Sequence, residues 1–225
     1  MLSGTFSARA YSFFDTLLWI ACLNMLWIVF TLLGMGVLGA GPATAAAQIL
    51  VRKRASGDQA PLLRSFAAEY FRNFGRANIL ALPVMGIAMA LVMNWNFYSG
   101  SNGLAANLMT AGIFVAAIFL AGSACYIFPL YARYDLPLVQ YFLTSSRFAL
   151  RHLAGTVILL FVSAAAVYAS SAVPGLIPFF SVGAWLYATG WLCDRFFTAN
   201  DESVAAMSDP QAVPESHYAP EATPA

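Results

Sequence analysis

The sequence predicts an all-α protein that crosses a bilayer as a polytopic bundle of about five membrane-spanning helices. Two observations carry this prediction. Only 9% of the 225 residues are charged and 60% are hydrophobic, whereas a soluble domain carries about a quarter charged residues to keep its surface wet. The charges are also grouped, so that the intervals 16–51, 77–132 and 152–193 contain no Asp, Glu, Lys or Arg.

The lengths of these intervals set the number of crossings. A hydrocarbon core of ~30 Å takes about 20 helical residues, so the first interval holds one crossing plus an interfacial remainder and the other two hold two each. Each long interval has a turn near its middle, at the polar segment 94–103 and at Pro174-Gly175. Continuously apolar runs favour helices over barrel strands, which alternate. We therefore expect helices at 14–38, 77–93, 104–130, 153–173 and 176–193.

The basic residues predict the orientation of the chain. With an odd number of crossings, all Lys and Arg except Arg9 fall on one side of the membrane, and that side is expected to be cytoplasmic. The N-terminus is then outside and the C-terminus cytoplasmic. The opening residues do not resemble a cleaved signal peptide, because the apolar run is too long and no basic segment precedes it.

The chain divides into a transmembrane domain, residues 1–197, and a tail, residues 198–225. The tail is rich in Ala and Pro, carries acidic residues and has no Lys or Arg. Such a composition cannot bury enough apolar area to offset the entropy of ordering, so we expect the tail to be disordered.

The loop at 61–76 is the most informative part of the polar regions. Its aromatic residues recur at helical spacing while its arginines point in other directions, which predicts an amphipathic helix lying among lipid headgroups. A solvated connector and a docking surface for a partner protein are the alternatives. The residues expected to contact lipid or a partner are Arg64, Phe66, Tyr70, Phe71, Arg72, Phe74 and Arg76.

Two further patterns concern the architecture. The segment 137–142 echoes 61–66, which indicates either a parallel duplication or two helices that both start after a proline. Residues 34–39 match GxGxxG, but an apolar helix precedes them where a nucleotide site needs a strand. Small residues for close helix packing explain them better, with a helix break expected at Gly41 and Pro42.

The composition argues against several classes of function. A net charge of +1 gives no basic surface for nucleic acid, and three widely spaced cysteines indicate neither a disulfide framework nor a metal site. Polar residues inside spans are functional suspects, but Asp15 and Asn24 do not form a chain of buried acids. We therefore expect no enzyme and no catalytic, cofactor-binding or metal-binding residues.

A set of short motifs resembles a known family. They are Asn24 and Trp27, then 41–46 (GPATAA), 71–74 (FRNF), 128–130 (FPL) with 133–135 (RYD), and 151–153 (RHL). In their order and spacing over residues 14–197 these motifs resemble the YesL-like family of bacterial membrane proteins, a domain of unknown function. Members of that family are often encoded near carbohydrate-uptake transporters and glycan-degrading enzymes, which implies a supporting role in sugar uptake.

The sequence therefore predicts a non-enzymatic, multi-pass protein of the cell membrane that needs no cofactor. The leading hypothesis is an accessory or regulatory component of a carbohydrate transporter complex, with the lipid bilayer as its other partner. A transporter or permease-like subunit that moves a small solute is one alternative, and a membrane scaffold with no ligand is another. The oligomeric state is left open.

Overall fold

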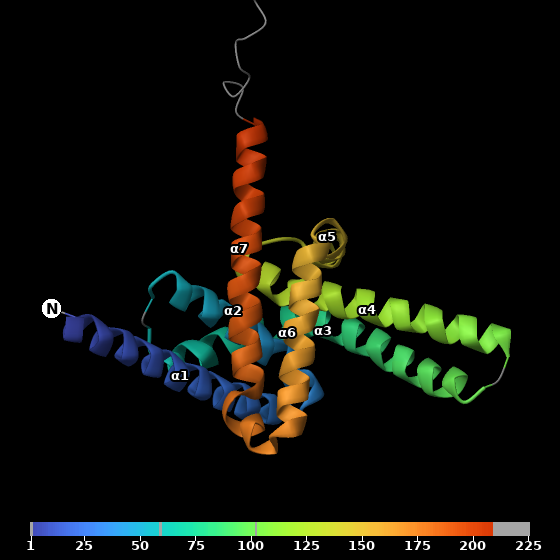
Figure 1. Ribbon diagram of the computed structural model, residues 1–225, viewed down its shortest axis with the longest axis horizontal. Coiled ribbons are helices and arrows are strands. Elements are labelled where there is room, and N and C mark those ends of the chain that lie inside the picture. The colour runs from blue at the N-terminus through green and yellow to red at the C-terminus, as the bar shows by residue number, and fades with distance from the viewer. Residues whose placement is uncertain (1, 59, 102, 209–225) are drawn as a thin grey trace, which may run out of the picture.

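The computed structural model describes residues 2–58, 60–101 and 103–208. Three helical hairpins make up the fold (Figure 1). The first pairs α1 (Leu2–Leu33) with α2 (Val37–Ala55), the second α3 (Leu62–Ser99) with α4 (Leu104–Arg133), and the third α6 (Leu153–Ala172) with α7 (Val182–Ser208). Helix α5 (Leu138–Arg151) joins the second hairpin to the third, and a 3-10 turn (Pro174–Leu176) and a π-helical turn (Ile177–Ser181) join α6 to α7.

The all-helical class and the five apolar helices are confirmed. Within the described residues, five helical segments are long and apolar enough to cross a membrane, and no strand is present. The predicted starts at 104 and 153 coincide with the first residues of α4 and α6. The prediction for the second span was too short, because α3 begins 15 residues before the expected residue 77.

Helix α2 is the element that the sequence analysis missed. The expected interfacial remainder of the first interval is a helix that returns antiparallel to α1, and most of its residues are buried. It contacts α1, α3, α4 and α7, so it forms the centre of the molecule. Its run of Ala and Gly is too weakly apolar to predict a membrane span, but it suits a helix that packs against four neighbours instead of lipid.

The turn between α1 and α2 lies earlier than predicted. We expected a break at Gly41 and Pro42, but both are buried inside α2. The chain turns at residues 34–36 instead, where Met35 and Gly36 have φ values of 60° and 75°. The left-handed conformation suits glycine, and two glycines flank Met35.

Close packing explains the other glycines of this hairpin. A Cβ on Gly39 would lie 2.3 Å from the carbonyl oxygen of Thr31 on α1, and a Cβ on Gly41 would lie 2.8 Å from the Cβ of Ala81 on α3. The glycines therefore let α2 approach helices on two of its sides. The GxGxxG match is thus a turn and a packing contact, in agreement with the expectation of small residues for close packing.

A contact inside the first hairpin brings its two outer ends together. Arg54 at the end of α2 donates to Asp15 of α1 at 2.6 Å and lies over the Trp19 ring, 4.8 Å from its centroid. The N-terminal part of α1 and the C-terminal end of α2 therefore lie together. The placement of the two termini on opposite sides of the membrane stays a prediction.

Two groups of buried side chains hold the hairpins together. One joins α4 to α5, α6 and α7 around Tyr126, Leu130 and Phe197. The other joins α1 and α2 to α3 and α7, with the ring of Phe30 5.1 Å from Phe66 and 5.0 Å from Tyr70. Aromatic pairs at such distances add to the free energy gained by burial.

The outer part of the second hairpin has no neighbour. The buried residues of α3 end at Ala81, and those of α4, apart from Ala106, begin at Gly122. We call residues 82–121 the α3/α4 arm. Figure 1 shows the arm extending away from the crossing point of the other helices, while α6 and α7 run in a different direction.

The boundary of the predicted tail also changes. Helix α7 continues to Ser208, so residues 198–208 are helical and do not belong to a disordered segment. The rest of the predicted tail, residues 209–225, lies outside the described residues. The echo between 61–66 and 137–142 is limited to the helix starts, because α3 runs on into the arm whereas α5 ends at Arg151.

Candidate functional site: the charged end of the bundle

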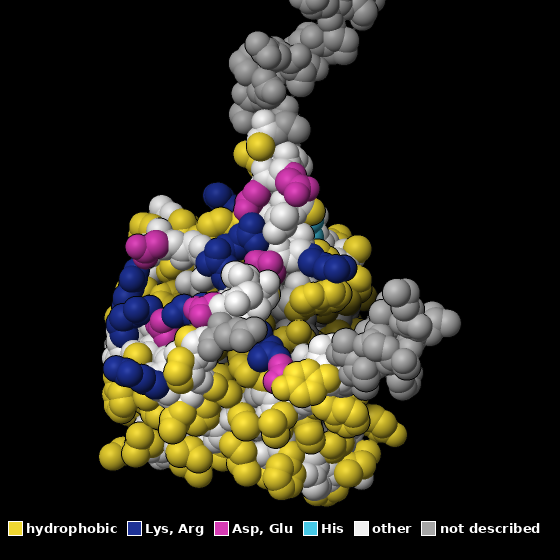
Figure 2. Space-filling view, turned by 90° about the vertical axis from the view of Figure 1, so that its left-hand side faces the viewer, with side chains coloured by type: hydrophobic (Ala, Val, Ile, Leu, Met, Phe, Trp, Pro, Cys, Tyr) yellow, Lys and Arg dark blue, Asp and Glu magenta, His cyan; other side chains and the backbone are white. Residues whose placement is uncertain are grey.

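Charged side chains gather at one end of the molecule. In Figure 2 the lysine, arginine and acidic side chains lie over the upper part of the visible face, and the lower part is almost entirely hydrophobic. We call this region the charged end and define it by residues 52–76, 133–152 and 194–202. It contains the end of α2, the start of α3, the end of α4, helix α5 and the last part of α7.

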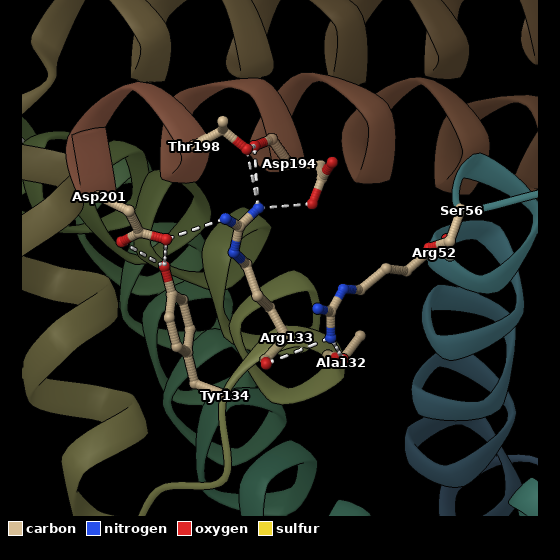
Figure 3. A network of polar contacts seen from close by, with 8 residues as sticks. All are labelled: Arg52, Ser56, Ala132, Arg133, Tyr134, Asp194, Thr198 and Asp201. Carbon is tan, nitrogen blue, oxygen red and sulfur yellow. Dashed lines mark hydrogen bonds and ion pairs between the residues drawn. The ribbon is translucent and has the colours of Figure 1, made fainter.

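Arg133 is the centre of one polar network at the charged end (Figure 3). Its Nη1 atom donates to Asp194 Oδ1 at 2.7 Å and to Thr198 Oγ1 at 3.1 Å, and its Nη2 atom donates to Asp201 Oδ2 at 2.9 Å. The three acceptors lie along α7 at intervals of three or four residues, so they share one face of that helix. Arg133 thereby ties the end of α4 to the last turns of α7.

Two neighbours complete this network. Arg52 of α2 donates to the carbonyl oxygens of Ala132 and Arg133, at 2.7 and 3.2 Å, which have no partner within a helix that ends there. The Tyr134 hydroxyl donates to Asp201 at 2.9 Å. Burial, together with the hydrogen bond to Asp201, raises the pKa of Tyr134 to about 12, so the phenol keeps the proton that it donates at neutral pH.

Glu69 is the centre of a second network. Its side chain is only 4% exposed, and it accepts from Lys53 Nζ at 3.0 Å, from Asn73 Nδ2 at 3.1 Å and from Arg72. The Tyr131 hydroxyl donates to Asn73 Oδ1 at 2.7 Å, which links the network to α4. A buried carboxylate is costly unless it is paired and hydrogen-bonded, and here two cations and an amide meet that need.

The cavity beside the Arg133 network is too small for a solute. The cavity beside the Arg133 network, lined by Gln48, Arg52 and Asp194 among others, has a volume of about 10 Å³. That is about the space of a single water molecule. The hydrogen bonds of the two networks therefore connect helices to one another, and the cavity beside Arg133 does not accommodate a substrate.

The residues predicted on 61–76 separate into two groups. Phe66 and Tyr70 are buried and Phe74 is half-buried against Tyr70, so the expectation that these aromatic side chains lie in lipid is wrong for Phe66 and Tyr70. The reason is that this segment is the first part of α3 and packs against α1 and α2.

The remaining predicted residues of 61–76 face outward. Phe71 is 64% exposed, and Arg64, Arg72 and Arg76 are exposed as well. Arg72 pairs with Glu69, and Arg76 pairs with Asp135 at 3.3 Å. Among the described residues, Arg72 and Arg76 are thus used in ion pairs. Of the exposed predicted residues this leaves Phe71 and Arg64 to contact lipid or a partner.

Asn24 is a polar side chain inside the bundle that connects one helix to another. Asn24 Nδ2 donates to the carbonyl oxygens of Ile177 and Pro178 at 3.0 and 2.7 Å, and the Gly183 N–H donates to Asn24 Oδ1 at 2.8 Å. These groups belong to the irregular turn before α7, where a regular helix would have bonded them internally. In lipid every backbone polar group needs a partner, and Asn24 supplies it.

Gln48 plays a comparable part in α2. Its Nε2 atom donates to the Leu186 carbonyl oxygen at 3.2 Å and to Thr189 Oγ1 at 3.3 Å, and a Cβ on Gly190 would lie 2.5 Å from Gln48 Oε1. The amide thus bonds α2 to α7 at a point where the two helices are in close contact.

Two hollows between helices are largely apolar. One of about 660 Å³ lies between α1 and the third hairpin and is lined by Trp27, Trp185 and several serines, but the Ser163 hydroxyl already accepts from Trp185 Nε1 at 2.9 Å. Another, of about 420 Å³, runs along the α3/α4 arm between residues such as Ala88, Phe114 and Ala117. Both match hydrocarbon chains or an apolar helix better than a hydrated solute.

Only weak signals in the sequence pointed to the two networks. Arg133 contributed to the topology argument, and no functional role was predicted for Asp194. In the structure Asp194 pairs with Arg133, and Arg195 lies over the Trp191 ring at 4.0 Å. Among the described residues, no group of three or more His, Cys, Asp or Glu side chains is placed to hold a metal ion.

Comparisons with known proteins relate this chain to one family. Residues 20–95 match the family described as "Protein of unknown function, DUF624". The chain is 30% identical to the uncharacterized protein YesV of Bacillus subtilis over 80% of its own length and 86% of the relative, and 31% identical to YteU of the same organism over 77% and 78%. It is 28% identical to YesL over 57% and 63%. No solved structure gives a significant match. With this identity and coverage, added to the shared family match, the chain belongs to the YesL-like DUF624 family.

Proposed function

We propose that this chain is a non-catalytic component of the cell membrane that binds to a carbohydrate transporter complex and supports or regulates it. The α3/α4 arm is the surface that would make this contact inside the bilayer. The charged end would face the cytoplasm, because ten of the eleven Lys and Arg residues belong to it and basic residues are retained on that side.

The observation that carries the proposal is how the polar groups inside the bundle are used. A permease must replace the hydration shell of its solute with polar groups along a path. The amide groups of Asn24 and Gln48 instead donate hydrogen bonds to backbone carbonyl oxygens and to the Thr189 hydroxyl. Two of the hollows between the helices, of about 660 and 420 Å³, are also lined mainly by apolar side chains. This favours an accessory component over a permease that moves a sugar by itself.

The α3/α4 arm supports a partner within the membrane. It exposes large apolar side chains on both helices, such as Val92, Met93 and Phe114, and its groove is floored by alanines. Small residues at a helix surface permit close approach of another helix, which is the main source of association energy in lipid. The link to carbohydrate uptake comes from the family resemblance in the sequence.

Site-specific photocrosslinking tests the proposal. A photoreactive phenylalanine analogue replaces Phe114, which lines the groove, and in a matched control it replaces Phe161, which is exposed on α6 but outside the groove. The expected result is an adduct between position 114 and a transport protein in native membranes. The control position should give only lipid adducts.

Two results would count against the proposal. One is an equal background at both positions, with no transport protein identified by mass spectrometry, which would leave the scaffold alternative. The other is uptake of radiolabelled mono- or disaccharides into vesicles that contain this chain alone, which would support the permease alternative.

A further inference from the structure

Helix α5 runs at a large angle to its neighbours in the chain. Figure 1 shows α5 almost end-on, whereas α4 before it and α6 after it lie along the plane of the picture. Helix α5 ends at Arg151 and α6 begins at Leu153, with only His152 between them. A helix that turns sharply out of the direction of a membrane-spanning helix, at the point where that span begins, lies along the surface of the membrane.

The side chains of α5 fall on three faces of the helix. The first is packed against the bundle and contains Tyr141, Ser145 and Ala149, all buried. The second is apolar and open, with Val139, Leu143 and Leu150 exposed by 69%, 54% and 60%. Residues 139, 143 and 150 recur at intervals of four and seven, so they form one stripe.

The third face is polar and adjoins the apolar stripe. Gln140, Arg147 and Arg151 are exposed there, and the two arginines are one turn apart on the same side of the helix. Neither arginine has an acidic partner among the described residues, whereas Arg54, Arg72, Arg76 and Arg133 are all in ion pairs. Two free guanidinium groups thus border an open apolar stripe.

We propose that α5 is an interfacial helix that binds anionic phospholipid. Leu143 and its neighbours on the stripe lie among the acyl chains, and Arg147 and Arg151 bind phosphate groups of the same leaflet. Guanidinium groups bind phosphate with paired hydrogen bonds, and an amphipathic helix with a basic edge is the usual device for this purpose. The proposal therefore assigns to α5 the lipid contact that the sequence predicted for residues 61–76.

A depth measurement tests the position of the stripe. Leu143→Cys and, as a control on the polar face, Gln140→Cys are each made in a Cys22→Ala background, because Cys22 is exposed while Cys125 and Cys193 are buried and will not label. The full chain carries an environment-sensitive fluorophore in nanodiscs that contain about one-third phosphatidylglycerol. We expect lipid-attached quenchers to act on position 143 and aqueous iodide to act on position 140.

A charge measurement tests the arginines. Each Arg near an anionic surface contributes about a five-fold gain in binding, so Arg147→Gln with Arg151→Gln should weaken retention of phosphatidylglycerol about 30-fold, read by native mass spectrometry. Arg64→Gln with Arg195→Gln removes the same charge elsewhere at the charged end and should change it little. The proposal fails if the two double variants retain the lipid equally. It also fails if position 143 is as accessible to iodide as position 140, which is the result expected if the stripe were a docking site for a partner protein that is absent from the nanodisc.

Discussion

Replacing Asn24 with leucine should destabilise the third hairpin, because this fully buried side chain makes three hydrogen bonds to the turn before α7 and to the first residues of α7. Three hydrogen bonds are lost. At about 0.6 kcal/mol for a bond in a membrane protein and ~1.5 kcal/mol for one that leaves a buried group unpaired, the loss is about 2 to 4 kcal/mol. For a chain of this size that corresponds to a fall in Tm of about 4 to 16 °C.

The assay follows the reaction of buried thiols during heating in detergent. Cys125 and Cys193 are buried and react only on unfolding, and Cys22→Ala removes the exposed thiol. The matched control is Asn94→Leu, since Asn94 is exposed and bonds only to the Ala90 carbonyl oxygen of its own helix. Equal Tm values for the Asn24 and Asn94 variants would refute the role assigned to Asn24.

Three other changes test the contacts at the charged end and the first turn. Glu69→Gln should lower the free energy of unfolding by about 2 kcal/mol, since it removes a buried charge that pairs with two partly exposed cations; the same thermal assay should show almost no change for Asp135→Asn, whose ion pair is exposed. Gly39→Ala should sharply reduce the yield of folded protein in size-exclusion chromatography, because its Cβ would clash with α1 backbone, whereas Gly75→Ala has open space and should fold normally. Asp201→Asn should weaken the hold of α4 on the end of α7, which faster amide hydrogen exchange over 198–208 would reveal and unchanged exchange would contradict.

The membrane-spanning helices could be predicted because lipid imposes a simple rule on their composition. A span must lack charge over about 20 residues, and the starts of α4 and α6 follow directly from the positions of Gly103 and His152 at the ends of polar segments. The family could also be predicted, because its short motifs occur in the family's order and spacing along this chain.

Helix α2 could not be predicted by that rule. It is shielded from lipid by four neighbouring helices, so alanine and glycine replace the large apolar residues that mark a span. The glycines at 34 and 36 were the available signal for the turn, but Pro42 attracted the prediction because proline more often starts a helix than continues it. In α2 it lies in the interior, and its missing N–H is tolerated.

The candidate site depended on contacts between distant parts of the chain. Arg133 and Asp201 are 68 positions apart, and Lys53 and Glu69 are 16 apart on different helices. No periodicity within one helix connects them. The amphipathic pattern of 61–76 was correctly identified, but amphipathicity does not distinguish an apolar face in lipid from one that packs against α1 and α2.

Because the α3/α4 arm is long and extends from the bundle, a small change of angle at its base moves its tip by a large distance. From Ala81, its last buried residue on α3, to the end of the helix the arm is ~27 Å long, so a tilt of about 10° at its root displaces its tip by about 5 Å. The base of the arm is held by the hydrogen bonds around Glu69 and Tyr131. Among the described residues, no other helix packs against its tip. A small change of angle at the root of the arm is therefore amplified into a larger displacement at its tip.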